Sequence, residues 1–202
     1  LICVENVIRS VGQRFADGIP ELGVAPLDPL KLDVVNLNSP SLKLVFKDTS
    51  VDGLRGFKLN SFRISVPKGK AILDFTVNVT LKGQYAMDGQ ILILPIKGNG
   101  DAKIKITNLT IILKYDFETR KNFWVVSSYT STHKMDRAQF KFLNLFNGNK
   151  HLEDATNRFL NENWEMIMQD LAPPAILQII QKCVDEVNKF YSVIPASLLL
   201  TP

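Results

Sequence analysis

The residues best suited to acid–base chemistry are the chain's two histidines, His133 and His151. His133 lies in the polar stretch STSTHKMDR, and His151 lies in the first turn of a predicted helix. The sequence has no Gly-x-Ser-x-Gly elbow, no glycine-rich phosphate loop and no His-Glu-x-x-His motif. The enzymatic alternative is a Ser/His/Asp triad, such as a lipid esterase would use, assembled from distant positions. We interpret both histidines as solvated side chains and expect no enzyme.

The sequence also has few residues that could carry metal or redox chemistry. No group of Cys and His residues has the spacing of metal ligands, so we expect no metal and no cofactor. Cys3 and Cys183 are the only cysteines. They leave three readings open, which are a bond to each other, a bond to a partner upstream of residue 1, or free thiols.

A few polar residues could contact a ligand or carry a modification. Tyr85, Tyr115 and Tyr129 each offer a hydroxyl, although all three are also ordinary sheet residues. Two tripeptides, beginning at Asn78 and Asn108, fit the N-glycosylation pattern. Chance matches to this pattern are common, so the two sites favour secretion only mildly.

Composition narrows the class of protein further. The 202 residues are 46% hydrophobic and 22% charged, with a net charge of +4. The lysines are scattered along alternating segments, which indicates solvated faces and no nucleic-acid partner. A weak attraction to anionic membranes is a further expectation, and no apolar run reaches the ~20 residues of a membrane span. The chain begins without Met, as a processed or trimmed product would.

The spacing of apolar residues predicts a helix, a connector and a long run of strands. Apolar residues recur at helical spacing over 2–16, and Gly18 closes that helix. Prolines and glycines make 18–30 an extended connector. From about 31 to 142 the pattern alternates, which predicts antiparallel strands. The expected turns are Asp52-Gly53, Pro67-Lys68-Gly69, Asp88-Gly89 and Gly98-Asn99-Gly100.

After residue 143 the period becomes helical. One amphipathic segment runs to Leu171, where Pro173-Pro174 must end or bend it, and a second runs to about Pro195. Together they cover about 40 residues, or roughly 60 Å if nearly collinear. A domain of this size has a radius of gyration near ~17 Å, so we expect an elongated molecule with its sheet wrapped along the helix.

The stretch QILILPIKGNGDAKIKITNLTIIL supports a sheet that curls. Its apolar positions are Ala102, Ile104 and Ile106, and then the phase slips so that Leu109 and Ile111 are apolar. A β-bulge shifts the alternation by one residue, and a sheet curled around a helix needs bulges. We therefore predict a bulge at Thr107-Asn108.

Three segments carry a resemblance to a known family. They are CVENVIRSVGQRFADGIPELGVAPLDPL, YAMDGQILILPIKGNGDAKIKITNLTI and FKFLNLFNGNKHLEDATNRFLNENW. The chain resembles the insect takeout and juvenile-hormone-binding protein family over essentially its whole length. The resemblance implies an α+β fold of the tubular lipid-binding, super-roll type, in which a highly curved antiparallel sheet wraps a long C-terminal helix. Residues 1–202 would form one elongated, takeout-like domain.

The resemblance also implies a function. Such proteins are secreted, extracellular carriers of small lipophilic ligands, in haemolymph or another fluid. We expect a monomer that binds a terpenoid, fatty acid or similar lipid in an apolar tunnel, with transient membrane contact. The alternatives are a juvenile hormone carrier proper and a membrane-surface module that recognises lipid head groups. Candidate lining residues are Phe75, Val77, Val79, Leu81, Ile104, Ile106, Leu109, Ile111, Leu113, Tyr115, Tyr129, Phe159 and Ile167.

The cysteines depart from the family pattern. Cys3 matches the second of a usual N-terminal pair, and the first would lie upstream of residue 1. The hormone-binding branch bonds a cysteine at the position of Cys183 to an earlier one, and this chain has no cysteine near 133–151. The difference favours the takeout-like branch with Cys183 as a buried free thiol, and a Cys3–Cys183 bond is the alternative.

Overall fold

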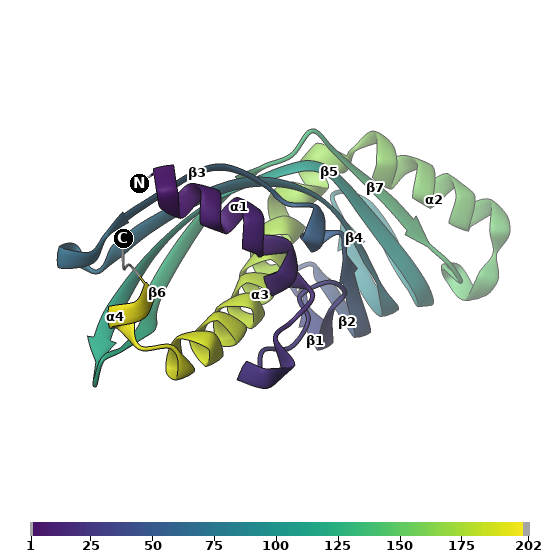
Figure 1. Ribbon diagram of the computed structural model, residues 1–202. Helices are drawn as coiled ribbons and strands as arrows, with labels where there is room; N and C mark the ends of the chain where they lie inside the picture. The colour runs from purple at the N-terminus through teal and green to yellow at the C-terminus, as the bar shows by residue number, and fades with distance from the viewer. Residues whose placement is uncertain (1, 200–202) are drawn as a thin grey trace.

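The alternating part of the sequence forms one antiparallel sheet that arches over a long helix (Figure 1). The computed structural model describes residues 2–199, without the side chains of residues 2–4 and 7. Within that range the sheet has seven strands. They are β1 (Leu30–Asn36), β2 (Leu42–Asp52), β3 (Lys58–Ser65), β4 (Lys70–Ile91), β5 (Leu94–Arg120), β6 (Phe123–Lys134) and β7 (Arg137–Phe142).

Two very long strands form the spine of the sheet. β4 has 22 residues and β5 has 27, and they pair with each other along almost their whole length. The main path is β1-β2-β4-β5-β6, while β3 pairs with the first part of β4 and β7 pairs with the middle of β5. β4 and β5 therefore pair with different neighbours at their two ends, so that the sheet bends around the helix beneath it.

The helices lie where the apolar spacing predicts them. α1 (Ile2–Ala16) lies across the near side of the molecule, α2 (Lys150–Glu162) beside β7, and α3 (Trp164–Val193) beneath the arch (Figure 1). The short α4 (Ala196–Leu199) follows α3, and 3-10 turns occupy Pro20–Leu22, Leu54–Gly56, Val66–Lys68 and Phe146–Gly148. Among the described residues, no helix is both long and apolar enough to cross a membrane.

Two predicted turns are wrong. Asp88-Gly89 lies inside β4 and Gly98-Asn99-Gly100 lies inside β5, while the hairpin turns at Leu92-Ile93. The glycines serve close approaches instead, because a Cβ on Gly89 would lie 2.3 Å from the carbonyl oxygen of Ser41. A Cβ on Gly98 would lie 2.6 Å from the hydroxyl of Tyr85. The other two predicted turns, at Asp52-Gly53 and Pro67-Lys68-Gly69, are confirmed.

The predicted bulge is confirmed. The register of β4 and β5 shifts between the pairs Val77–Leu109 and Val79–Ile106, which places one extra residue on β5. Asn108 adopts a positive φ of 50°, which Asn tolerates better than most residues. Its N–H donates to Oδ1 of Asn78 at 2.7 Å, so the unpaired backbone group still has a partner.

Of the two predicted outcomes at Pro173-Pro174, an end or a bend of the helix, the end is wrong. Both prolines lie inside α3, and the helix is interrupted ten residues earlier at Asn163. Buried residues on both sides of the prolines, Leu171, Ala172 and Ile176, hold α3 against the core. Tertiary packing therefore outweighs the two lost backbone hydrogen bonds. Asn163 joins α2 to α3, and its side-chain amide donates to the carbonyl oxygen of Phe159 at 2.8 Å.

Side chains from the helices cover the free edges of the sheet. Asn157 and Asn161 of α2 bond to the backbone of β7. Gln178 of α3 bonds to N–H and C=O of Asn36 in β1, and Glu5 of α1 accepts from the N–H of Phe62 in β3. These contacts satisfy edge groups that could otherwise pair with another chain.

Candidate functional site

The inner face of β4 and β5 carries most of the residues predicted to line a ligand site. The register places Phe75 opposite Ile111 and Leu81 opposite Ile104, and directly opposed residues in a sheet point to the same face. Seven members of the predicted set are buried in the core beneath α3, at 2–7% exposure. They are Val77, Val79, Leu81, Ile104, Leu109, Ile111 and Ile167.

The other predicted residues keep part of their surface accessible. Phe75, Ile106, Leu113, Tyr115, Tyr129 and Phe159 are half-buried. Phe75, Leu113 and Tyr115 lie together. The register pairs Leu113 with Leu73 and Tyr115 with Ala71, and these partners lie two and four residues before Phe75 on the same face of β4. The strand members of the predicted set are therefore brought onto one face, with a better packed part against α3 and a looser part toward β3 and β6, while Phe159 and Ile167 come from α2 and α3.

A second apolar cluster adjoins this looser part. Its buried members are Leu59, Phe62, Ala71, Phe117 and Trp124, and half-buried side chains of α1 and α3 pack against it. The Trp124 ring lies 4.6 Å from that of Phe117 and 5.7 Å from that of Tyr191, between centroids. Sequence reasoning missed Trp124 and Tyr191 as site residues. The density of aromatics at 115–124 was the available signal, whereas only the fold brings Tyr191 to them.

Two tyrosine hydroxyls meet in this apolar surrounding. The hydroxyl of Tyr115 on β5 lies near that of Tyr191 on α3. Burial raises the pKa of both phenols, so both hydroxyls are neutral and can donate at physiological pH. Both side chains are nevertheless half-buried rather than fully covered.

Cys183 lies on the same helix, two turns before Tyr191. It is a free thiol, and burial raises its pKa to about 12, with the charge of Glu186 as a smaller cause. The thiol is therefore protonated at neutral pH. The predicted free thiol is confirmed, although its side chain is half-buried and not fully buried. Cys3 lies outside the residues whose side chains the structure describes.

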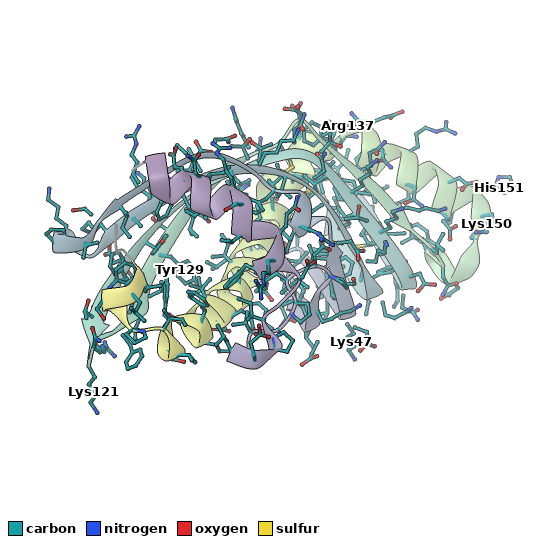
Figure 2. The ribbon with its side chains drawn as sticks, viewed as in Figure 1. Lys47, Lys121, Tyr129, Arg137, Lys150 and His151 are labelled. Carbon is teal, nitrogen blue, oxygen red and sulfur yellow. The ribbon has the colours of Figure 1, made fainter. Side chains whose placement is uncertain are left out.

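The inner face of the second half of β6 is polar, whereas Trp124 and Val126 in its first half are apolar. The register places Tyr129, Ser131 and His133 opposite Tyr115, Leu113 and Ile111, and thus on the inner face. Tyr129 lies between β6 and α3 (Figure 2), where its hydroxyl donates to Gln181. This side of the site is closed by polar side chains, unlike the apolar face of β4 and β5.

The prediction that His133 is a solvated side chain is wrong. It is half-buried on the inner face, and burial lowers its pKa, so the imidazole is neutral near pH 7. The polar residues around it in the sequence concealed this, because every second one points outward. His151 is exposed in the first turn of α2, as expected (Figure 2). Neither imidazole hydrogen-bonds to another described residue, and no three described His, Cys, Asp or Glu residues are grouped as metal ligands.

Comparisons with known proteins agree with this architecture. The sequence model of the family described as "Haemolymph juvenile hormone binding protein (JHBP)" matches residues 2–201. The crystal structure of takeout 1 from Epiphyas postvittana superimposes with a TM-score of 0.93 at 31% identity, over 97% of this chain and 94% of that one.

Two relatives extend the comparison. The circadian clock-controlled protein daywake of Drosophila melanogaster is 29% identical over 193 residues, which cover 85% of this chain and 72% of that protein. A putative beta-carotene-binding protein of Schistocerca gregaria is 29% identical over 110 residues, 53% of this chain and 44% of that protein.

Proposed function

Because the chain belongs to the haemolymph juvenile hormone binding protein family, we propose that it is a secreted carrier of an elongated apolar molecule. The members of this family are takeout-like and hormone-binding proteins, which bind hydrophobic ligands and are not enzymes. The cargo, a terpenoid, fatty acid or similar lipid, would lie in an internal tunnel between α3 and the inner face of the sheet. Binding would be reversible and would make or break no covalent bond.

One observation carries the proposal. Leu73, Phe75, Leu113 and Tyr115 lie on the inner face of the sheet, yet each is only half-buried. Apolar side chains that face a well-packed interior normally lose nearly all of their accessible surface. Surface that remains accessible on this face supports an apolar space beside the packed core, open to a ligand.

Cys183 and Tyr191 support the same reading from the side of α3. Burial raises the pKa of both groups, so protein surrounds them closely, and yet each keeps some accessible surface. A group that is shielded from bulk water but still accessible to a small probe is typical of the wall of an internal space. Tyr191 packs against the cluster that contains Trp124, and Cys183 packs against the main core.

The energetics suit an apolar cargo. A ligand with about 15 buried methylene equivalents gains roughly 12 kcal/mol on transfer from water. Loss of translational and rotational freedom offsets several kcal/mol of that gain. A hydrogen bond to one tyrosine hydroxyl adds only ~1 kcal/mol. Affinity would therefore come from the apolar lining, and the paired hydroxyls of Tyr115 and Tyr191 would set the orientation of a polar end.

Surface features support secretion. Asn78 and Asn108, which begin the two glycosylation tripeptides, are both exposed. Asn108 binds its neighbours Asn78 and Asp136, whereas the Nδ2 of Asn78 has no hydrogen-bond partner among the described residues. Asn78 is thus the position at which a glycan fits without displacing a contact.

Extraction of the native cargo tests the proposal. The protein would be expressed through the secretory pathway of insect cells, purified without detergent and measured by native mass spectrometry before and after organic extraction. We expect a mass above that of the glycosylated chain, and its loss on extraction together with one lipophile per chain. A protein that yields no lipophile and binds no fluorescent fatty acid after extraction would overturn the proposal.

A further inference from the structure

Lysines that are far apart in the sequence form one row on the outer face of the sheet. The register places Lys31 opposite Ser50, Ser50 opposite Lys82, Lys82 opposite Lys103, and Lys103 opposite Lys141. The row crosses β1, β2, β4, β5 and β7, and all four lysines are exposed. Neighbouring strands are about 4.8 Å apart, so the row is about 20 Å long.

The charges in this row are only partly compensated. Lys82 forms an ion pair with Asp52 at 3.0 Å. The side chains of Lys103 and Lys141, directly opposite each other, form no ion pair or hydrogen bond with any described residue. Like charges at directly opposed positions destabilise a sheet. The row therefore costs stability in the free protein, and an anion would relieve that cost.

A groove of about 640 Å³ follows the same row. Three lysines and two aspartates line it, together with Gln84 and Leu143; they are Lys82, Lys103, Lys141, Asp48 and Asp101. Lys47 and Lys105 extend the basic surface on either side. Lys105 is the next outward residue after Lys103 on β5, and Lys47 is separated from Ser50 on β2 by the bulge. Lys47 projects from the lower edge of the sheet in Figure 2. The amide of Gln84 donates to Asp101, which forms no ion pair with a described residue.

We propose that this lysine row is a docking surface for the anionic headgroups of a lipid membrane. Lysine is a flexible point charge, whereas arginine is the usual residue for bidentate recognition of one defined phosphate. The groove contains no arginine and no aromatic side chain on which a nucleic-acid base could stack. A row of separate lysines about 20 Å long matches many headgroup charges in one plane better than a single small anion. The surface lies on the opposite side of the sheet from the inner face, so it does not depend on the identity of any cargo.

Vesicle sedimentation with matched charge variants tests this proposal. The vesicles would contain phosphatidylcholine alone, or phosphatidylserine as about a third of the lipid. We expect sedimentation only with phosphatidylserine, and its loss between about 0.1 M and 1 M salt, as the Debye length falls from about 10 Å to 3 Å. Each basic residue near such a surface changes binding about fivefold, so Lys103→Gln with Lys141→Gln should lower partitioning about 25-fold.

The control variant removes the same charge elsewhere. Lys68 and Lys121 are exposed in turns outside the row, and Lys68→Gln with Lys121→Gln should lower partitioning less than about threefold. An equal loss in both variants would overturn the proposal, because net charge alone would then explain binding. Absence of wild-type binding to phosphatidylserine vesicles would also overturn it. Retention on heparin that needs Lys103 and Lys141, without vesicle binding, would assign the row to a soluble polyanion instead.

Discussion

The side-chain amide of Asn161 bonds to both backbone groups of Phe140, accepting from its N–H at 2.9 Å and donating to its C=O at 2.8 Å. One helical turn earlier, Asn157 makes the same pair of bonds to Phe142. An amide side chain has the donor and acceptor of a peptide group, so the two asparagines act as a short further strand on the edge of β7. They fix α2 against the sheet and close this edge to other chains.

Substitution of Asn161 should therefore destabilise the fold. Asn161→Asp keeps the shape but can no longer donate to Phe140, and it sets a carboxylate against a carbonyl oxygen. We expect a loss of about 1–3 kcal/mol in the free energy of unfolding, measured by urea denaturation. Glu162→Ala, at the exposed neighbouring position, should change it by less than about 0.5 kcal/mol. Equal losses in the two variants would show that the contact with Phe140 contributes nothing.

Local patterns predict the elements of this fold well, and they fail where distant segments meet. The phase slip at Thr107-Asn108 predicts the bulge because the alternation of faces is a local property. Asp88-Gly89 looks like a turn, but Gly89 is required by the close approach of Ser41, which no local pattern reveals. Likewise Pro173-Pro174 stays helical because residues from the sheet bury the turns on either side.

Prediction of the site residues from the sequence has the same limit. The inward residues of β4 and β5 can be predicted from alternation alone, and the structure brings them onto one face. Whether such a residue is buried, like Val77, or half-buried, like Leu113, depends on which side chains of α3 pack against it. The lysine row is the clearest case, because Lys82, Lys103 and Lys141 look scattered in the sequence and become neighbours only through the register.

Stability should depend on pH through Glu186. This carboxylate is 1% exposed. Burial alone would raise its pKa, but hydrogen bonds from Lys189 and from the N–H of Ala25 outweigh burial, and the pKa lies below its usual value of 4.5. A lowered pKa means that the unfolded chain binds more protons in acid. The stability that the Glu186 carboxylate contributes is therefore complete above about pH 4.5, and it is lost as the pH falls through the pKa of the folded state.

Comparison with a neutral isostere isolates this contribution. Glu186→Gln should lower the free energy of unfolding by about 2 kcal/mol at pH 7. The gap from the wild type should narrow as the pH falls below about 4.5, because Glu186 then takes up a proton, first in the unfolded chain and at lower pH in the folded one. Asp185→Asn, at the adjacent exposed position, is the control because it removes the same charge outside the contacts of Glu186. A gap that stays constant from pH 7 to about 3 would contradict this assignment.

The paired tyrosines should affect the choice of ligand more than stability. Tyr191→Phe removes one hydroxyl from the contact with Tyr115 and keeps the ring against Trp124. We expect affinity for a fatty alcohol to fall about fivefold, because one hydrogen bond is worth about 1 kcal/mol, and affinity for an alkane probe to stay within twofold. Tyr85→Phe is the control, since this buried side chain donates its hydroxyl to the carbonyl oxygen of Leu143, away from Tyr191. A Tyr85→Phe effect of equal size, or equal losses for both ligands, would exclude this role for Tyr191.

A matched pair of tryptophan substitutions on β5 tests the central claim most directly. Leu113 points to the inner face, while the adjacent Ile112 points to the outer face opposite Asp74, and both are half-buried. The measurement is titration of each delipidated variant with a fluorescent fatty acid, after circular dichroism has shown that both variants fold. We predict that Leu113→Trp fills the space beside α3 and weakens binding at least tenfold, and that Ile112→Trp changes it less than about twofold. Equal affinities for the two folded variants would contradict an internal apolar site.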